Sequence, residues 1–230
     1  MKVPCFFLLL ISVLSVNAQT VLDLKFSDDA AVDTVGGREV ELINVVVMKA
    51  GETGYGDFDG RGAVVVPADP ELTFPAQDLL WIELWVNPMK LGNSGTMVTK
   101  GTGGNYRFAA EADGTIVFVY YSQGTWRSLR SEEKLTLYEW QHVAVWFDSP
   151  MGEVRLYLNG RLVGKGSKYP PFQSKDDLPL VVGATAKSTG DGYVGISGGI
   201  GPVLVARGNP RDVSSDSEIG TQVFEVESPF

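Results

Sequence analysis

Short stretches in which apolar and polar residues alternate follow one another along most of the chain. Residues 21–26 and 39–42 alternate almost strictly, whereas residues 81–86 and 143–147 are nearly continuous apolar runs. Alternation with a period of two is typical of strands with one buried face, and short apolar runs are typical of strands buried on both faces. We therefore expect strands at residues 21–26, 39–42, 45–47, 63–66, 81–86, 96–100, 106–110, 115–121, 125–131, 140–147, 153–158, 161–165, 180–182 and 202–206.

Turn-forming residues separate these strands. Asn159-Gly160, between two apolar stretches, is the strongest hairpin signal, because a type I′ turn needs positive φ at both central residues and Asn and Gly tolerate it best. No window longer than about ten residues has helical periodicity, and we expect only a short helical turn at residues 215–219. The pattern predicts an all-β fold with two packed antiparallel sheets, a β-sandwich of the jelly-roll type.

The first eighteen residues differ from the rest of the chain. Lys2 precedes an apolar run at residues 6–16, and Val16-Asn17-Ala18 fits the small-x-small end of a secretory signal peptide. The run is too short for a bilayer, which needs roughly twenty apolar residues. We predict that residues 1–18 are a signal peptide cleaved near Ala18, that residues 19–230 form a single domain, and that the protein is secreted or extracytoplasmic. An uncleaved membrane anchor is the alternative.

Composition limits the partners and the chemistry. The 230 residues include 28 acidic and 19 basic side chains, which gives a formal net charge of −9. This balance argues against nucleic acids and against anionic membrane surfaces, because phosphate groups are bound by clustered Lys and Arg. Membrane insertion is not expected either, because the longest apolar runs after residue 18 are only as long as a strand. The only cysteine is Cys5 and the only histidine is His142. A disulfide framework and a zinc site built from Cys or from two His residues are therefore excluded.

One block of sequence resembles a known family. Residues 140–148, WQHVAVWFD, lead into residues 152–160, GEVRLYLNG. Together they resemble the signature of laminin-G-like, concanavalin A-like jelly-roll domains. Residues 58–65, residues 81–86 and the closing glycine-rich segments between 180 and 201 agree with the family in order and spacing. The resemblance covers essentially the whole chain after the signal peptide, and it implies a fold that carries both glycan-binding modules and polysaccharide-active enzymes.

The resemblance also raises the question of calcium. Relatives that bind a structural Ca²⁺ hold it partly with carboxylates from the chain ends, and many relatives have an acidic pair after the last glycines. This chain has Gly201-Pro202 at that place. We therefore predict no cofactor and leave the metal unassigned, with structural calcium as an alternative. Calcium needs six to eight oxygen ligands. Some of them could come from the carboxylates of Asp23, Asp28, Asp29, Asp33 and Asp59.

Two pairs of residues represent the enzymatic alternative. His142 with Tyr157 could act as in the alginate-type lyases that share this fold. In those lyases, the resemblance implies that the His is paired with Tyr and Lys on the final strand. Residues 202–206, the final strand here, contain neither. Glu39 and Glu41 share a strand face, and a glycosidase needs two close carboxyl groups. Polar residues surround that pair, which is typical of a solvated sheet face. We expect His142 to be structural and predict no catalytic residue.

Aromatic and arginine residues interleave on three consecutive predicted strands, residues 106–131. Neighbouring antiparallel strands bring such side chains onto one face, although alternation must separate Tyr120 from Tyr121. Flat rings suit the apolar face of a sugar, and arginine suits its polar edges. The predicted ligand-binding residues are Tyr106, Arg107, Tyr121, Trp126 and Arg130.

The alternative for these aromatic residues is packing in the core, which we also expect for Trp81, Trp85, Trp140 and Trp146. The leading hypothesis is a secreted, non-catalytic binding module for a glycan or an extracellular protein. A polysaccharide lyase or hydrolase and a structural adhesive protein are the alternatives. The net charge disfavours a strongly acidic ligand unless the arginines form a local positive patch. The sequence does not indicate an oligomeric state.

Overall fold

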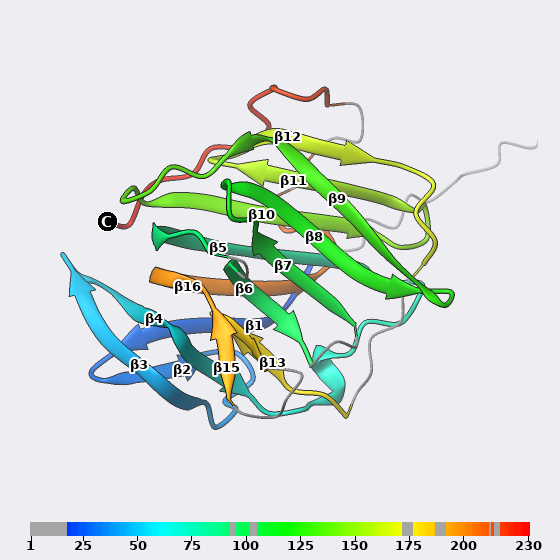
Figure 1. The fold of residues 1–230 in the computed structure, drawn as a ribbon. Coiled ribbons are helices and arrows are strands. Elements are labelled where there is room, and N and C mark those ends of the chain that lie inside the picture. Colours follow the sequence, from blue (N-terminus) through cyan, green and yellow to red (C-terminus); the bar gives the residue numbers. More distant parts are fainter. Residues whose placement is uncertain are drawn as a thin grey trace, which may run out of the picture.

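The computed structural model describes residues 18–92, 95–101, 105–171, 177–186, 192–211, 213 and 217–230. These residues form a 14-stranded antiparallel sheet that folds over into two packed layers, with a separate two-stranded hairpin (Figure 1). This confirms the predicted all-β sandwich. Within the described ranges, no helix has the length and apolar character needed to span a membrane.

The first layer has the strand order β2-β1-β16-β5-β10-β11-β12. Its strands are β1 (Gln19–Ser27), β2 (Ala30–Asp33), β5 (Leu79–Lys90), β10 (Gln141–Asp148), β11 (Glu153–Leu158), β12 (Arg161–Gly166) and β16 (Ser197–Arg207). The second layer has the order β3-β4-β13-β6-β7-β8-β9. Its strands are β3 (Glu41–Ala50), β4 (Thr53–Val66), β6 (Gly95–Lys100), β7 (Tyr106–Ala110), β8 (Thr115–Ser122), β9 (Thr125–Lys134) and β13 (Leu180–Val182). The remaining elements are the hairpin β14 (Ala184–Ala186) and β15 (Tyr193–Gly195) and the 3-10 turn η1 (Pro70–Leu72).

Strand β4 connects the layers. Its first half pairs with β16 and its second half pairs with β13. Between the halves, Gly60 has a φ of 89°, and Asp59 Oδ1 accepts the backbone N–H groups of Arg61 and Gly62 at 2.7 and 2.9 Å. The opposing strand β3 shifts register beside Asn44, whose φ is 51°. Turn chemistry at this point therefore bends a continuous strand, and our prediction of a strand only from residue 63 missed its first half.

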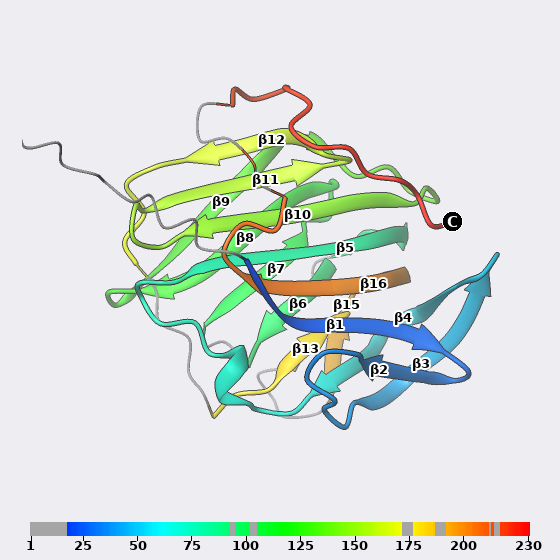
Figure 2. The same ribbon diagram turned by 180° about the vertical axis from the view of Figure 1, so that it is seen from behind.

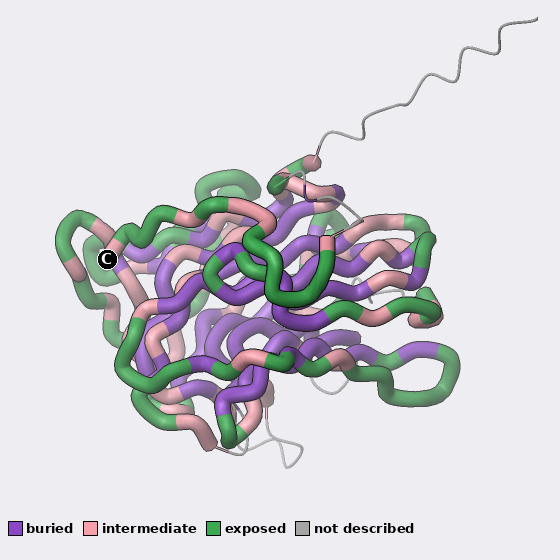
Figure 3. Tube along the Cα trace, turned by 90° about the horizontal axis from the view of Figure 1, so that it is seen from above, coloured by how far each residue is buried: buried purple, intermediate pink, exposed green. Residues whose placement is uncertain are grey.

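Apolar side chains from both layers fill the space between them. Inward-facing residues of β7 and β8 meet those of β10, as in the contact of Tyr120 with Phe147, whose ring centroids are 5.0 Å apart. Figure 3 shows buried segments in both layers and exposed loops around them. A buried side chain of this size stabilises the fold by about 1.5–3 kcal/mol. The largest apolar members include Phe58, Phe74, Tyr106, Phe108, Phe118, Tyr120 and Phe147.

Most of the predicted strands are present. The Asn159-Gly160 hairpin joins β11 to β12, with φ values of 50° and 77°, which confirms positive φ at both positions. Strands β2 and β14 were not predicted. The predicted signal peptide, except Ala18, and residues 215–216 of the predicted helical turn lie outside the described residues.

Candidate functional site

The outer surface of the second layer is formed by β7, β8 and β9. Strand pairing places Arg107 opposite Val119 and Tyr121 opposite Trp126. Because side chains alternate along a strand, residues two apart share a face. Arg107 is thus a diagonal neighbour of Tyr121, about 7–8 Å away between backbone positions. We call this surface the open face; it consists of Arg107, Ala109, Glu111, Val117, Val119, Tyr121, Trp126, Ser128 and Arg130.

Tyr121 and Trp126 form an exposed aromatic pair at one end of the open face. Their side chains are 44% and 50% exposed, and their ring centroids lie 5.3 Å apart in an edge-on arrangement at 65°. Large aromatic rings normally bury most of their surface, so a solvent-facing pair is available to contact another molecule.

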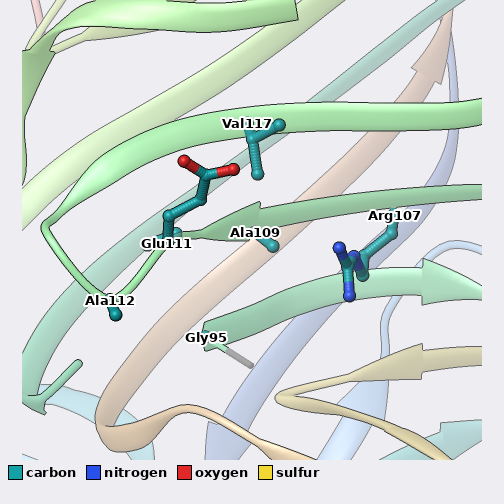
Figure 4. A pocket seen from close by; sticks show the side chains of 7 residues that line it. Gly95, Arg107, Ala109, Glu111, Ala112 and Val117 are labelled. Atoms are coloured by element: carbon teal, nitrogen blue, oxygen red, sulfur yellow. The ribbon is translucent and has the colours of Figure 1, made fainter. Parts of the chain in front are cut away.

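A pocket of about 230 Å³ lies further along the open face, between Arg107 and Glu111. In Figure 4, the side chains of Arg107 and Glu111 lie on the same side of β7 with Ala109 between them, and Gly95 forms part of the edge from β6. Small residues line most of the pocket, because glycine and alanine leave space above the sheet that larger side chains would fill. The complete lining is Gly95, Arg107, Ala109, Ala110, Glu111, Ala112 and Val117.

One arginine of the open face is paired with a carboxylate and another is not. Arg130 and Glu111 form an ion pair, with Nη2 donating to Oε1 at 2.7 Å and Nε donating to Oε1 at 3.1 Å. This interaction raises the pKa of the Arg130 guanidinium. The guanidinium of Arg107, in contrast, has no hydrogen bond or ion pair with any residue in the described part of the chain. The open face therefore carries one free guanidinium.

The structure corrects one predicted binding residue. Tyr106 is 1% exposed and faces the interior, because it pairs with the inward-facing Tyr120 across β7 and β8. Burial also raises the pKa of its phenol. The other four predicted residues, Arg107, Tyr121, Trp126 and Arg130, share the open face.

The outer surface of the first layer also gathers aromatic and charged residues. Glu83 of β5 accepts hydrogen bonds from Arg211 at 2.6 and 2.9 Å and from Trp81 Nε1 at 3.0 Å, and its carboxylate lies 3.6 Å from His142 Nε2. Burial alone would raise the pKa of Glu83, but the interactions with His142 and Arg211 outweigh it and lower that pKa to about 2. We call this surface the covered face; it consists of Trp81, Glu83, Trp85, His142, Ala144, Trp146 and Tyr157.

The segment of residues 217–230 covers this face (Figure 2). Its backbone is hydrogen-bonded to β12, where Leu162 N donates to Thr221 O at 3.0 Å. Phe224 contacts the rings of Trp81 and Tyr157, with centroid distances of 5.9 and 5.3 Å. Phe230 stacks on Trp140 at 3.7 Å with an interplanar angle of 8°.

The predicted tryptophan core is only partly correct. Trp81 and Trp146 are buried, but Trp85 and Trp140 are half-buried on the outside of the first layer. Phe230 contacts both rings, and its centroid lies 6.2 Å from that of Trp85. The sequence-based prediction placed all four tryptophans in the core, whereas all four lie on the outer side of the first layer. Trp81 and Trp146 belong to a second apolar cluster there, and Trp85 and Trp140 contact Phe230.

The residues of the enzymatic alternative lie in two unconnected places. His142 and Tyr157 are diagonal neighbours on the covered face, 2% and 0% exposed beneath Phe224. The backbone of His142 also holds the hairpin, since His142 N donates to Asn159 Oδ1 at 2.8 Å. Glu39 and Glu41 are exposed beside a separate open depression.

One of the carboxylates considered for calcium, Asp33, is paired with an arginine. Arg38 is nearly buried and donates to Asp33, Asp69 and Glu71 at 2.6, 3.0 and 2.9 Å. Burial would raise the pKa of Asp33, but hydrogen bonds from the Gly36 backbone and from Arg38 lower it. Within the described ranges, no three His, Cys, Asp or Glu side chains form a metal-binding group. Because the Arg38 guanidinium already occupies the carboxylate of Asp33, Asp33 does not fit a calcium site.

Solved structures of other proteins share this fold. A solved structure of domain 4 of AbnA, an extracellular arabinanase from Geobacillus stearothermophilus, in complex with arabinotriose, has a TM-score of 0.68 at 17% identity over 84% of this chain and 96% of that chain. The binding domain of Paraclostridial mosquitocidal protein 1 has a TM-score of 0.62 at 12% identity over 82% of this chain and 48% of that chain. The binding domain of botulinum neurotoxin DC in complex with SialylT has a TM-score of 0.57 at 15% identity over 82% and 47%.

These identities show a shared fold alone, and the chain spans about half the length of the two toxin domains. No curated protein matches the chain. Residues 58–196, more than half of the chain, match the family model Laminin_G_3. The chain therefore belongs to the concanavalin A-like lectin/glucanases superfamily.

Proposed function

We propose that this protein is a secreted, non-catalytic module that binds a glycan on its open face. The observation that carries the proposal is the solvent-facing pair of Tyr121 and Trp126 on the same sheet face as Arg107, whose free guanidinium lines a pocket. A sugar ring has an apolar face and polar edges, so an aromatic pair next to hydrogen-bond donors matches its chemistry.

The arrangement supports binding rather than bond cleavage. Among the residues of the open face, Glu111 alone has a carboxyl group, and it is paired with Arg130. A retaining or inverting glycosidase needs two carboxyl groups on opposite sides of the scissile bond. The Trp126 ring would contact the apolar side of the sugar, while Arg107 would donate hydrogen bonds to its oxygens.

Two of the structural neighbours support a glycan as the ligand class. The arabinanase domain was solved with arabinotriose, and the neurotoxin domain was solved with SialylT. At these identities the neighbours share the fold with this chain, so the transfer of a glycan ligand is part of the proposal.

The test is a glycan array probed with the full chain produced through a secretory host. Trp126→Ala should weaken binding at least about tenfold, because it removes the stacking ring. Tyr138→Ala is the matched control, since Tyr138 is 71% exposed outside the open face. Unchanged binding by Trp126→Ala, or no bound glycan at all, would contradict the proposal.

Secretion has its own test. Mass spectrometry of the protein collected from the medium should give an N-terminus at Gln19. Retention of residues 1–18 on a membrane-bound product would contradict cleavage and support the anchor.

A further inference from the structure

We propose that the open face selects sugars that carry a carboxylate, such as uronic acids, and that Arg107 binds that carboxylate. This inference rests on the proposed function, since it names the class of glycan for the same surface. It goes further, because an aromatic platform by itself would accept neutral sugars equally well.

The first argument is the pairing of the arginines. Four arginines of the described part of the chain are buried or half-buried, and three of them, Arg38, Arg155 and Arg207, each contact a carboxylate. Arg107 is the fourth, and no acceptor within the described ranges contacts it. A half-buried arginine whose five N–H donors have no partner in the described part of the chain can offer them to an incoming acceptor.

The second argument is the shape around Arg107. Its side chain enters the pocket from one end, and Gly95 and Ala109 leave the adjacent space free (Figure 4). A guanidinium presents parallel N–H groups that match the two oxygens of a carboxylate. A sugar ring on Trp126 would direct a ring substituent toward Arg107, because Arg107 is the diagonal neighbour of Tyr121.

The third argument is local charge. Glu111 is neutralised by Arg130, so the positive charge of Arg107 is left uncompensated on the open face. The chain as a whole has a net charge of −9. Screening limits interactions between exposed charges to about 8 Å at physiological salt, so a single carboxylate in contact with Arg107 is favoured although the whole protein repels a dense polyanion. The surface therefore fits isolated carboxylates better than heavily sulfated chains.

The experiment is calorimetric titration of the full chain with trigalacturonic acid and with 3′-sialyllactose, each compared with its methyl ester. At least one acid should bind at least about tenfold more tightly than its ester. Arg107→Gln should abolish that preference, and Arg107→Lys should restore only part of it, because lysine keeps the charge but lacks the planar fork.

Arg127→Gln is the matched control, since Arg127 lies on β9 of the same layer, is exposed and faces away from Trp126. Circular dichroism of each variant verifies folding. If acid and ester bind equally, or if Arg107→Gln leaves the preference intact, the inference is overturned. If the array yields only neutral glycans whose binding depends on Trp126, the inference fails while the proposed function stands. If no glycan binds at all, both fail.

Discussion

The open face and the covered face contain similar residue types but differ in what surrounds them. Each has aromatic rings and an Arg–Glu ion pair. On the covered face, Glu83 is 7% exposed and also accepts a hydrogen bond from Trp81. On the open face, the side chains of Arg130 and Glu111 are 57% and 39% exposed. The comparison teaches that burial and completed pairing make one cluster structural, while an exposed ring pair and a free guanidinium leave the other available.

The largest effect should come from Glu83→Gln. The substitution leaves Arg211 without its carboxylate, and breaking a buried pair in this way costs about 3 kcal/mol of unfolding free energy. Urea unfolding monitored by circular dichroism measures it. Glu111→Gln, the matched change on the open face, should cost less than about 1 kcal/mol because both partners are solvated. Equal costs for the two variants would remove the distinction between the faces.

Low pH should remove the stability that the Glu83 cluster of the covered face contributes. The pKa of Glu83 is about 2 in the folded protein and 4.5 in its reference state, so Glu83 binds fewer protons in the folded state than in the unfolded state. Its contribution is therefore complete above pH 4.5 and is lost as the pH falls toward 2, by about 2.5 kcal/mol at pH 2.5. Urea unfolding of the wild type at pH 6 and pH 2.5, compared with Glu83→Gln, isolates this part. A difference between the two proteins that does not change with pH would contradict it.

Opening the covered face should have a slightly smaller effect. Phe224→Ala removes a half-buried ring from Trp81 and Tyr157, and we expect a loss of about 2 kcal/mol. Tryptophan emission should shift to longer wavelength as Trp81 gains water. Trp126→Ala on the open face should change the unfolding free energy by no more than about 0.5 kcal/mol. Stability that is insensitive to Phe224 would show that the C-terminal segment is a loose cover.

Calcium should have the smallest effect. Because Arg38 already satisfies Asp33, we expect the melting temperature in millimolar Ca²⁺ and in EDTA to agree within about 1 °C. Differential scanning fluorimetry measures this, with Mg²⁺ as the ionic-strength control. A calcium-specific rise of several degrees would restore the calcium alternative.

The parts of the fold that were predictable depend on local chemistry. Asn159-Gly160 specifies its hairpin through two positive φ angles, and alternation places Arg107 and Tyr121 on one face once the strands are paired. Tyr106 was misassigned, although alternation with Phe108 and Arg107 in the same strand already indicated an inward position. That signal was present in the sequence and was overlooked.

The covered face depends on distant contacts. Glu83 binds Arg211, which lies 128 positions later in the chain, and no local pattern connects the two. Residues 217–230 have no strand or helix periodicity, so their packing over Trp85 and Trp140 could not be read from spacing. The sequence therefore indicated which residues are aromatic or charged, and tertiary structure decided which of them are accessible.

Strands β4 and β16 are hydrogen-bonded to each other, and each also pairs with strands of its own layer. The two layers therefore cannot separate without breaking the hydrogen bonds between β4 and β16, and we expect both layers to unfold in one cooperative transition. A ligand bound to the open face should then raise the temperature at which the whole molecule unfolds. The emission of Trp81 and Trp140, on the opposite side of the molecule, should follow this transition during heating, so it can be used without a label to screen for ligands.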